Sequence, residues 1–188
     1  MTDVPKVLST MRAFSGLVFN VRVDRVRDAD GSEHRLDIVE HGGSFAILAT
    51  PNPGTIVLVR QYRHAIGSTL WELPAGRSEA GEEPVAGAAR ELREETGYRA
   101  GRMRPLVSLY STPGFCDEIL HFFHADELEA GEQALDDDED IEVGIFRLDA
   151  AWRLVADGVI ADCKTVVGLL WAQAHNDEFG GGFSRQSS

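Results

Sequence analysis

The sequence predicts an α+β fold, because strand-like and helix-like segments share one chain of 188 residues. Residues 16–26 alternate apolar and polar side chains over most of their length, as a half-buried strand does. Residues 55–62 are nearly all apolar in their first half, which is typical of a central strand. Residues 84–97 read as a helix that begins at a proline and ends at a glycine, the residues favoured at those ends.

The N-terminal region predicts an antiparallel β-hairpin ahead of the main domain. After the run 16–26, a turn-forming cluster at 28–31 leads into a second strand-like run at 36–40. Two strands alone are marginally stable in water. We therefore expect the hairpin to pack against its own domain or against a second subunit.

The rest of the chain supplies further strand and helix candidates. Strand-like runs cover 45–48, 105–111, 119–125 and 141–148, and helical spacing covers 149–157 and 164–175. We divide the chain into N-terminal strands at 1–43, a main domain at 44–176 and a Gly- and Ser-rich tail at 177–188. We expect that tail to be disordered.

Charge and cysteine usage exclude several classes of protein. Eighteen basic against 31 acidic residues give a formal net charge of −13, which repels a nucleic-acid backbone. A small anionic substrate would be repelled as well, unless a bound metal inverted the local field. Cys116 and Cys163 lie far apart with no CxxC spacing, so neither a zinc site nor a disulfide framework is indicated. The sequence has no long apolar run and no signal-peptide pattern, so we expect a cytoplasmic protein that does not enter membranes.

Three carboxylates share one face of the predicted helix 84–97. Glu91, Glu94 and Glu95 stand at i, i+3 and i+4, where like charges destabilise an isolated helix by roughly 0.2–0.5 kcal/mol per pair. A solvated face with salt bridges to Arg90 and Arg93 is one interpretation. The opposite face is small and apolar, however, so the helix should pack closely and hold its acids at fixed positions. A rigid cluster of oxygen ligands is what a hard cation such as Mg²⁺ requires.

The spacing around these acids resembles a known motif. Gly76 is followed after five residues by Glu82, and after seven more by the run RELREETG at 90–97. This pattern resembles the complete box of the Nudix hydrolases, with one departure at Tyr98, where that family more often has an aliphatic residue. The resemblance implies the Nudix fold, a mixed β-sheet sandwiched between helices (α/β/α), here with an N-terminal antiparallel β-hairpin extension.

Features outside the box are similar to the ADP-ribose pyrophosphatase branch of that family. They are RQYR at 60–63, WELPAG at 71–76 and Pro113 in a PGFxDE-like stretch. The resemblance implies a Mg²⁺- or Mn²⁺-dependent hydrolase that cleaves ADP-ribose to AMP and ribose 5-phosphate. It also implies a homodimer in which the N-terminal strands, within 1–43, complete the partner's substrate pocket.

The same resemblance assigns residues to the reaction centre. The metal ligands would be the carbonyl of Ala75 and the carboxylates of Glu91 and Glu95, with Glu94 as a further ligand or hydrogen-bond partner. Glu94 and Glu95 thereby count as catalytic residues.

Four residues of the box have a structural role by the same resemblance. Glu82 and Arg90 would form an internal ion pair that ties the loop to the helix. Gly76 and Gly97 complete the motif.

A general base and the substrate contacts lie outside the box. The resemblance places the base in the acidic run at 136–140, at Glu139 with Asp137 as the alternative. Arg63 would contact the phosphate or the terminal ribose, and Pro113 is assigned to the substrate site.

Two residues of the hairpin are candidates for contacts with the adenine. Asp37 and His41 both lie on its second strand. A histidine in such a position is more often an ordinary surface residue, so of the two interpretations of His41 the structural one is favoured over contact with the adenine.

Two other functions remain open at this point. The first is a pyrophosphatase for GDP-mannose, another nucleotide sugar or a nucleotide cofactor. The second is a nucleotide-sensing module that uses the fold without catalysis. A complete box favours the enzyme.

Overall fold

The computed structural model describes residues 4–135 and 140–183 of the chain. Contacts between Cα atoms divide the chain into two compact units. The first unit is Met1–Gly43 with Leu109–Leu120, and the second is Ser44–Ser108 with His121–Ser188. Within the described ranges, every helix is too short or too polar to cross a lipid bilayer.

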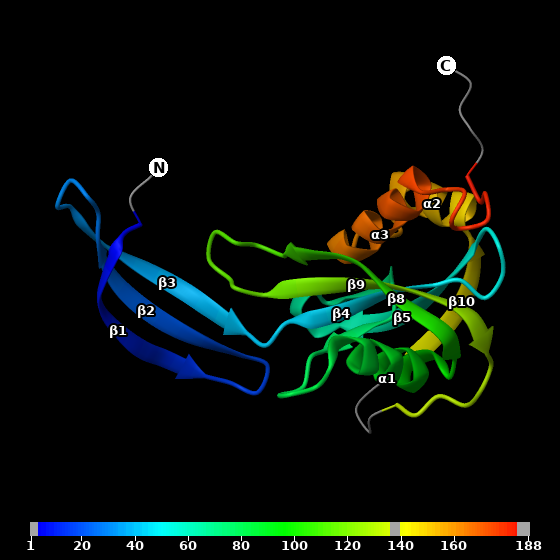
Figure 1. Cartoon of the computed structure of the whole chain (residues 1–188), viewed down its shortest axis with the longest axis horizontal. Coiled ribbons are helices and arrows are strands. Elements are labelled where there is room, and N and C mark those ends of the chain that lie inside the picture. The colour runs from blue at the N-terminus through cyan, green and yellow to red at the C-terminus, as the bar shows by residue number, and fades with distance from the viewer. Residues whose placement is uncertain (1–3, 136–139, 184–188) are drawn as a thin grey trace, which may run out of the picture. The chain divides into compact units, whose positions relative to one another are not determined.

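The first unit contains a three-stranded antiparallel sheet in the order β1-β2-β3 (Figure 1). The strands are β1 Lys6–Ser15, β2 Phe19–Arg27 and β3 Glu33–His41. The predicted hairpin is present as β2 and β3, and the tight turn between them includes Gly31 with a φ of 87°. Positive φ favours glycine at this position.

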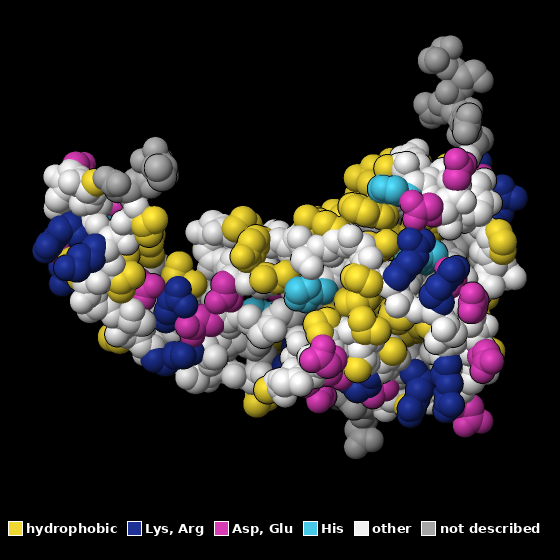
Figure 2. All heavy atoms as spheres, viewed as in Figure 1, with side chains coloured by type: hydrophobic (Ala, Val, Ile, Leu, Met, Phe, Trp, Pro, Cys, Tyr) yellow, Lys and Arg dark blue, Asp and Glu magenta, His cyan; other side chains and the backbone are white. Residues whose placement is uncertain are grey.

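Strand β1 was not predicted. Nine of its ten residues are exposed, so it lacks the alternation of apolar and polar side chains that marks a half-buried strand. Large apolar side chains are among them: Val7 is 54%, Met11 61% and Phe14 52% exposed. Figure 2 shows hydrophobic side chains on the surface of this sheet. Backbone pairing with β2, which no side-chain pattern reports, holds β1 in place.

The second unit is built on two sheets, β10-β5-β6 and β7-β4-β9-β8. Strand β5 is central in its sheet and pairs antiparallel with both neighbours, as its apolar run predicts. The strands are β4 Ser44–Ala49, β5 Thr55–Arg63, β6 Ser68–Glu72, β7 Ala75–Arg77, β8 Arg99–Tyr110, β9 Ile119–Glu129 and β10 Ile141–Arg147, and a short 3₁₀ turn covers His64–Ile66.

Helices lie on both faces of these sheets, which confirms the α/β/α prediction (Figure 1). Helix α1, Pro84–Thr96, contacts β4, β7 and β10 on one face. On the other face lie α2, Leu148–Ala156, and α3, Cys163–Ala174, which contact each other; α2 also contacts β10, and α3 contacts β4. Beneath α1 the core joins Phe45 of β4, Leu92 of α1 and Phe123 of β9, all at most 2% exposed. Full burial of one such side chain stabilises the fold by about 1.5–3 kcal/mol.

The prediction of disorder from residue 177 onward is wrong for residues 177–183. Phe179 and Phe183 are 2% and 8% exposed, and Gly54 donates its N–H to the Phe179 carbonyl at 2.8 Å. The Asn176 side chain also forms two hydrogen bonds with the backbone of Phe183. Two aromatic side chains in a Gly-rich segment therefore suffice to fold it onto the turn before β5. Residues 184–188 lie outside the described residues.

Candidate active site

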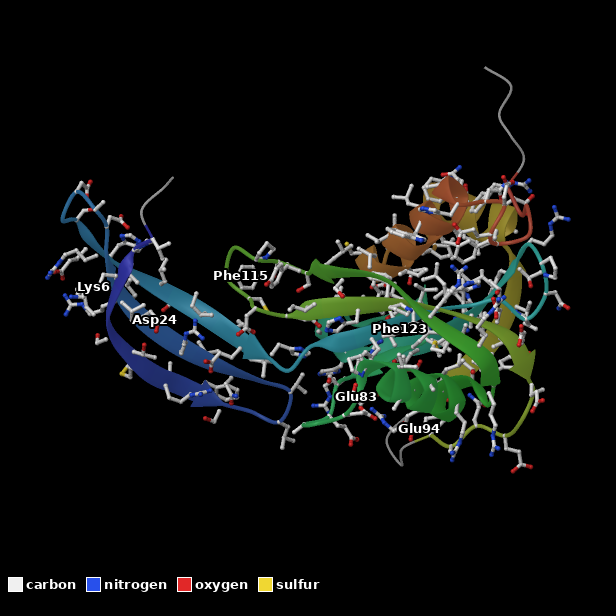
Figure 3. All side chains as sticks on the ribbon, viewed as in Figure 1. Lys6, Asp24, Glu83, Glu94, Phe115 and Phe123 are labelled. Atoms are coloured by element: carbon white, nitrogen blue, oxygen red, sulfur yellow. The ribbon has the colours of Figure 1, made fainter. Side chains whose placement is uncertain are left out.

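Helix α1 begins and ends where the sequence predicts. Pro84 occupies its first turn, and Gly97 follows its end with a φ of 77° and donates its N–H to the Arg93 carbonyl at 2.8 Å. That left-handed conformation closes the helix and strongly favours glycine. Figure 3 labels Glu83 before the helix and Glu94 on its last turns. The helix therefore presents its acidic residues from a rigid element.

Arg90 gathers three carboxylates around one guanidinium. Its Nε and Nη2 donate to the two oxygens of Glu82 at 2.9 and 3.0 Å, so the loop before α1 is joined to the helix. Its Nη1 donates to Glu91 and to Glu94, both at 2.9 Å. Hydrogen bonds to Glu82 above all raise the pKa of Arg90, and the same bonds hold the pKa of Glu82 below its ordinary value. The ion pair between Arg90 and Glu82 is thus part of the structure.

Strand β7 lies close against the acids of α1. The Ala75 N–H donates to Glu95 Oε2 at 2.9 Å, and Glu95 is only 3% exposed. A Cβ atom on Gly76 would stand 1.9 Å from the carboxyl carbon of Glu91, a distance that no real side chain tolerates. Glycine at 76 therefore lets the strand approach the helix until Ala75, Glu91 and Glu95 meet.

The chemistry of these groups fits a hard divalent cation. Glu91, Glu94 and Glu95 are oxygen donors on one helix face, and Mg²⁺ takes carboxylates and water in preference to nitrogen or sulfur ligands. Among the described residues no three acidic, histidine or cysteine side chains converge on one point in the arrangement of a metal site. Arg90 contacts one oxygen each of Glu91 and Glu94.

A second charged cluster connects β5, β6 and α3. Arg63 donates to both oxygens of Glu72 at 2.8 Å, and Lys164 Nζ also contacts Glu72 Oε2. Glu72 is only 2% exposed. Burial is the largest influence on its pKa and raises it, but Arg63 and Lys164 together hold that pKa below the ordinary value. Glu72 is therefore ionised and doubly paired.

Sequence reasoning missed Lys164 and gave Glu72 no role. Glu72 is the second residue of the WELPAG stretch, so the resemblance carried by that stretch could have identified it as a candidate site residue. Lys164 lies 92 residues from Glu72 on α3, where a single lysine has no local pattern to distinguish it from a surface charge.

The segment after β9 is tied to the end of α1. The Gln133 side chain donates to the carbonyls of Glu95 and Ile141 at 2.6 and 3.3 Å, and the Ala134 N–H donates to the Glu94 carbonyl at 3.0 Å. The base candidates Glu139 and Asp137 lie outside the described residues.

The remaining substrate candidates belong to the first unit. The His41 N–H donates to Asp117 Oδ1 at 2.8 Å, and Val39 pairs with the loop that contains Pro113, its N–H donating to the Phe115 carbonyl at 2.7 Å. The structure therefore brings His41 and the Pro113 loop together. Asp37 is not part of this group, because its carboxylate, 61% exposed, bonds to Arg35.

Comparison with known proteins relates this chain to the NUDIX domain family and to hydrolases of nucleoside diphosphate compounds. A family model described as the NUDIX domain matches residues 40–163. The chain is 39% identical over 170 residues to an ADP-ribose pyrophosphatase of Bacillus subtilis, covering 89% of this chain and 92% of that protein. It is 37% identical over 157 residues to a GDP-mannose pyrophosphatase of Klebsiella pneumoniae, covering 77% and 79%. A crystal structure of an ADP compounds hydrolase shares the fold, with a TM-score of 0.85 at 19% identity over 96% of this chain and 98% of that one.

Proposed function

Because the chain belongs to the NUDIX domain family and is a Nudix hydrolase, we propose that it cleaves the diphosphate bond of ADP-ribose and releases AMP and ribose 5-phosphate. The observation that carries this proposal is the contact of β7 with the acidic face of α1. It gathers Ala75, Glu91 and Glu95 at one place beside the Arg63 cluster. The identity to an ADP-ribose pyrophosphatase over most of both chains supports the choice of substrate.

We assign the divalent cation, Mg²⁺ or Mn²⁺, to the carboxylates of Glu91 and Glu95 and to the carbonyl of Ala75, with Glu94 as a further ligand or hydrogen-bond partner. When bound, such a cation neutralises diphosphate oxygens and lowers the pKa of a coordinated water. The carboxylates themselves keep their positions through Arg90 and the Ala75 N–H. Their rigidity limits the loss of entropy on binding.

We assign substrate contact to Arg63 and proton abstraction to Glu139, with Asp137 as the alternative. Arg63 donates hydrogen bonds from Nε and Nη2 to Glu72, and its side chain is 39% exposed. A planar guanidinium held in this way can donate from its remaining edge to a phosphate or ribose oxygen. A carboxylate that takes a proton from the attacking water contributes roughly 10²–10⁴-fold to such reactions.

We also propose that the protein is a homodimer, that His41 contacts the nucleobase with Asp37 as a further contact from the exposed part of the same strand, and that Pro113 contributes to the substrate site. The support is the exposed apolar surface of β1, since such surfaces mark interaction sites. Sedimentation equilibrium should give twice the mass of the 20.6 kDa chain. A monomer at micromolar concentration would contradict this part of the proposal.

The decisive experiment is hydrolysis of a panel of diphosphate compounds with and without Mg²⁺. ADP-ribose should give AMP faster than any other compound, and chelation with EDTA should abolish the reaction. The second candidate function is hydrolysis of GDP-mannose, which the relative from Klebsiella pneumoniae favours. A preference for GDP-mannose would select that candidate, and no turnover of any compound would contradict both.

A further inference from the structure

The carboxylate of Glu72 is shared between two cations on different elements. Arg63, at the end of β5, holds both of its oxygens at 2.8 Å. Lys164, on the first turn of α3, contacts Oε2 as well. Because Glu72 is 2% and Lys164 14% exposed at the side chain, this contact is largely shielded from water, where ion pairs are strongest.

Lys164 is itself fixed by the start of its helix. Its Nζ lies 3.1 Å from Oδ2 of Asp162, the residue that caps α3 by accepting from the Thr165 N–H at 2.9 Å. The Thr165 hydroxyl in turn accepts from the Leu73 N–H at 2.8 Å, directly after Glu72. The lysine therefore stands at a fixed place relative to the strand that carries Glu72.

Arg63 and Lys164 differ in exposure and in surroundings. The Arg63 side chain is 39% exposed, and the negative charge of Glu95 acts on it together with those of Glu72 and Asp162. The Lys164 side chain is 14% exposed, and its Nζ forms ion pairs with Glu72 and Asp162. The charges of Arg63, Lys164, Glu72 and Asp162 cancel, so the loss of Lys164 would leave a net negative charge next to Glu95.

We propose that Lys164 is a positioning residue for substrate binding: it anchors and neutralises Glu72, so that Glu72 holds the Arg63 guanidinium with one edge turned to an anionic or hydroxylated ligand. This inference rests on the proposed role of Arg63 as a substrate contact. Without Lys164, Arg63 alone balances a buried carboxylate, and any shift of Arg63 toward substrate leaves that carboxylate uncompensated.

The test compares Lys164→Met and Lys164→Arg with the wild type. Steady-state KM and kcat are measured for whichever of ADP-ribose and GDP-mannose the wild type hydrolyses, and metal-free dissociation constants are measured for both by calorimetry. Lys164→Met should raise KM and the dissociation constant about tenfold, as loss of a supporting residue commonly does, with a much smaller change in kcat. Lys164→Arg should restore the wild-type values within about threefold.

A matched control removes a cation elsewhere. Arg153→Met deletes a charge on α2 that is 74% exposed and paired with Asp149. Its KM should equal that of the wild type. Equal effects of Arg153→Met and Lys164→Met would overturn the inference, because only the overall charge would then matter.

A double variant tests whether Lys164 acts through Glu72. The KM of Glu72→Gln/Lys164→Met should lie close to that of Glu72→Gln alone, since the Glu72 charge is gone and only the pair of Lys164 with Asp162 remains to be lost. Additive effects would overturn the inference. If Lys164→Met fails to fold by circular dichroism, the comparison between the Glu72→Gln variants decides alone, because neither contains the buried charge.

These measurements separate the inference from the proposed function. A wild type that binds a diphosphate compound without hydrolysing it contradicts the proposed function, and the dissociation constants then judge Lys164. Turnover with unchanged KM in Lys164→Met contradicts the inference alone. A wild type that binds neither compound overturns both.

Discussion

The two units of the chain hold their charged side chains in different ways. In the second unit, Glu72 and Glu95 are 2% and 3% exposed and are held by hydrogen bonds from strands and helices far apart in the sequence. In the first unit, Asp24 is buried, but pairs such as Arg35 with Asp37 lie on the surface at 66% and 61% exposure. Buried pairs are rigid, whereas exposed pairs contribute little to stability. We therefore expect changes at the acids of α1 in the second unit to affect turnover, and changes in the first unit, like those in the cluster of Arg63, Glu72 and Lys164, to affect recognition.

The largest expected effect is the loss of a metal ligand in the second unit. Glu95→Gln or Glu91→Gln should lower kcat on the order of 10³-fold with the fold intact, because a bound cation supplies several kcal/mol of transition-state stabilisation. Glu83→Gln is the control, since Glu83 precedes α1 and its side chain caps nothing. Near-wild-type turnover in either ligand variant would remove the metal assignment.

Loss of the general base comes next. Glu139→Gln should lower kcat by roughly 10² or more while KM changes little, because the base acts only in the chemical step. Asp137→Asn should then have a minor effect. If the two variants behave in the reverse way, the base is Asp137, and a change confined to KM would count against both.

A change in the first unit should have a different signature. His41→Ala should raise KM by roughly threefold to tenfold, the loss of one modest contact, and leave kcat nearly constant. Arg25→Ala, which alters only the exposed pair of Arg25 with Glu33, is the control. A large fall in kcat for His41→Ala would break the contrast between the two units.

The smallest effect concerns the stability of the second unit in mild acid. Burial first, and then the positive charge of Arg104, lower the pKa of His124 from 6.5 to about 4. Arg104 donates to its Nδ1 at 2.9 Å, so the neutral ring can donate from Nε2 to the Thr50 hydroxyl at 2.8 Å. Since the unfolded chain binds the proton more readily, stability should fall as pH drops from 6.5 toward 4.

Urea unfolding between pH 6.5 and pH 5 measures this effect above the range in which carboxylates titrate. His124→Gln, which can still donate to Thr50, should show a flatter pH dependence than the wild type. Equal slopes for the two proteins would exclude His124 as the cause.

Local patterns in the sequence predicted those parts of the molecule that local physics determines. Alternating side chains located β2, and the turn cluster at 28–31 with the strand-like run after it located β3. The Pro84 to Gly97 segment located α1 with its acids on one face. The exposed strand β1 has no such pattern and was missed. Backbone pairing with β2 and the ion pair of Arg12 with Glu40 hold it, and neither leaves a local sequence pattern.

The candidate site divides in the same way. The resemblance of the box implied the ion pair between Glu82 and Arg90, which the structure contains. The close approach of Gly76 to Glu91 was not anticipated. Lys164 could not be found from sequence, since its contact with Glu72 joins elements 92 residues apart. Asp37 and His41 stand at i and i+4 on β3 and so share one face of the sheet. The sequence pattern does not report which of them is covered, and Asp37 is exposed and paired with Arg35.

The aromatic side chains that follow α3 bear on how this protein should be handled in the laboratory. Truncation after His175 would remove the Phe179 ring, whose centroid lies 4.4 Å from that of His124. It would also remove the carbonyl that accepts from the Gly54 N–H. A truncation that keeps residues 177–183 leaves both aromatic side chains and these contacts in place.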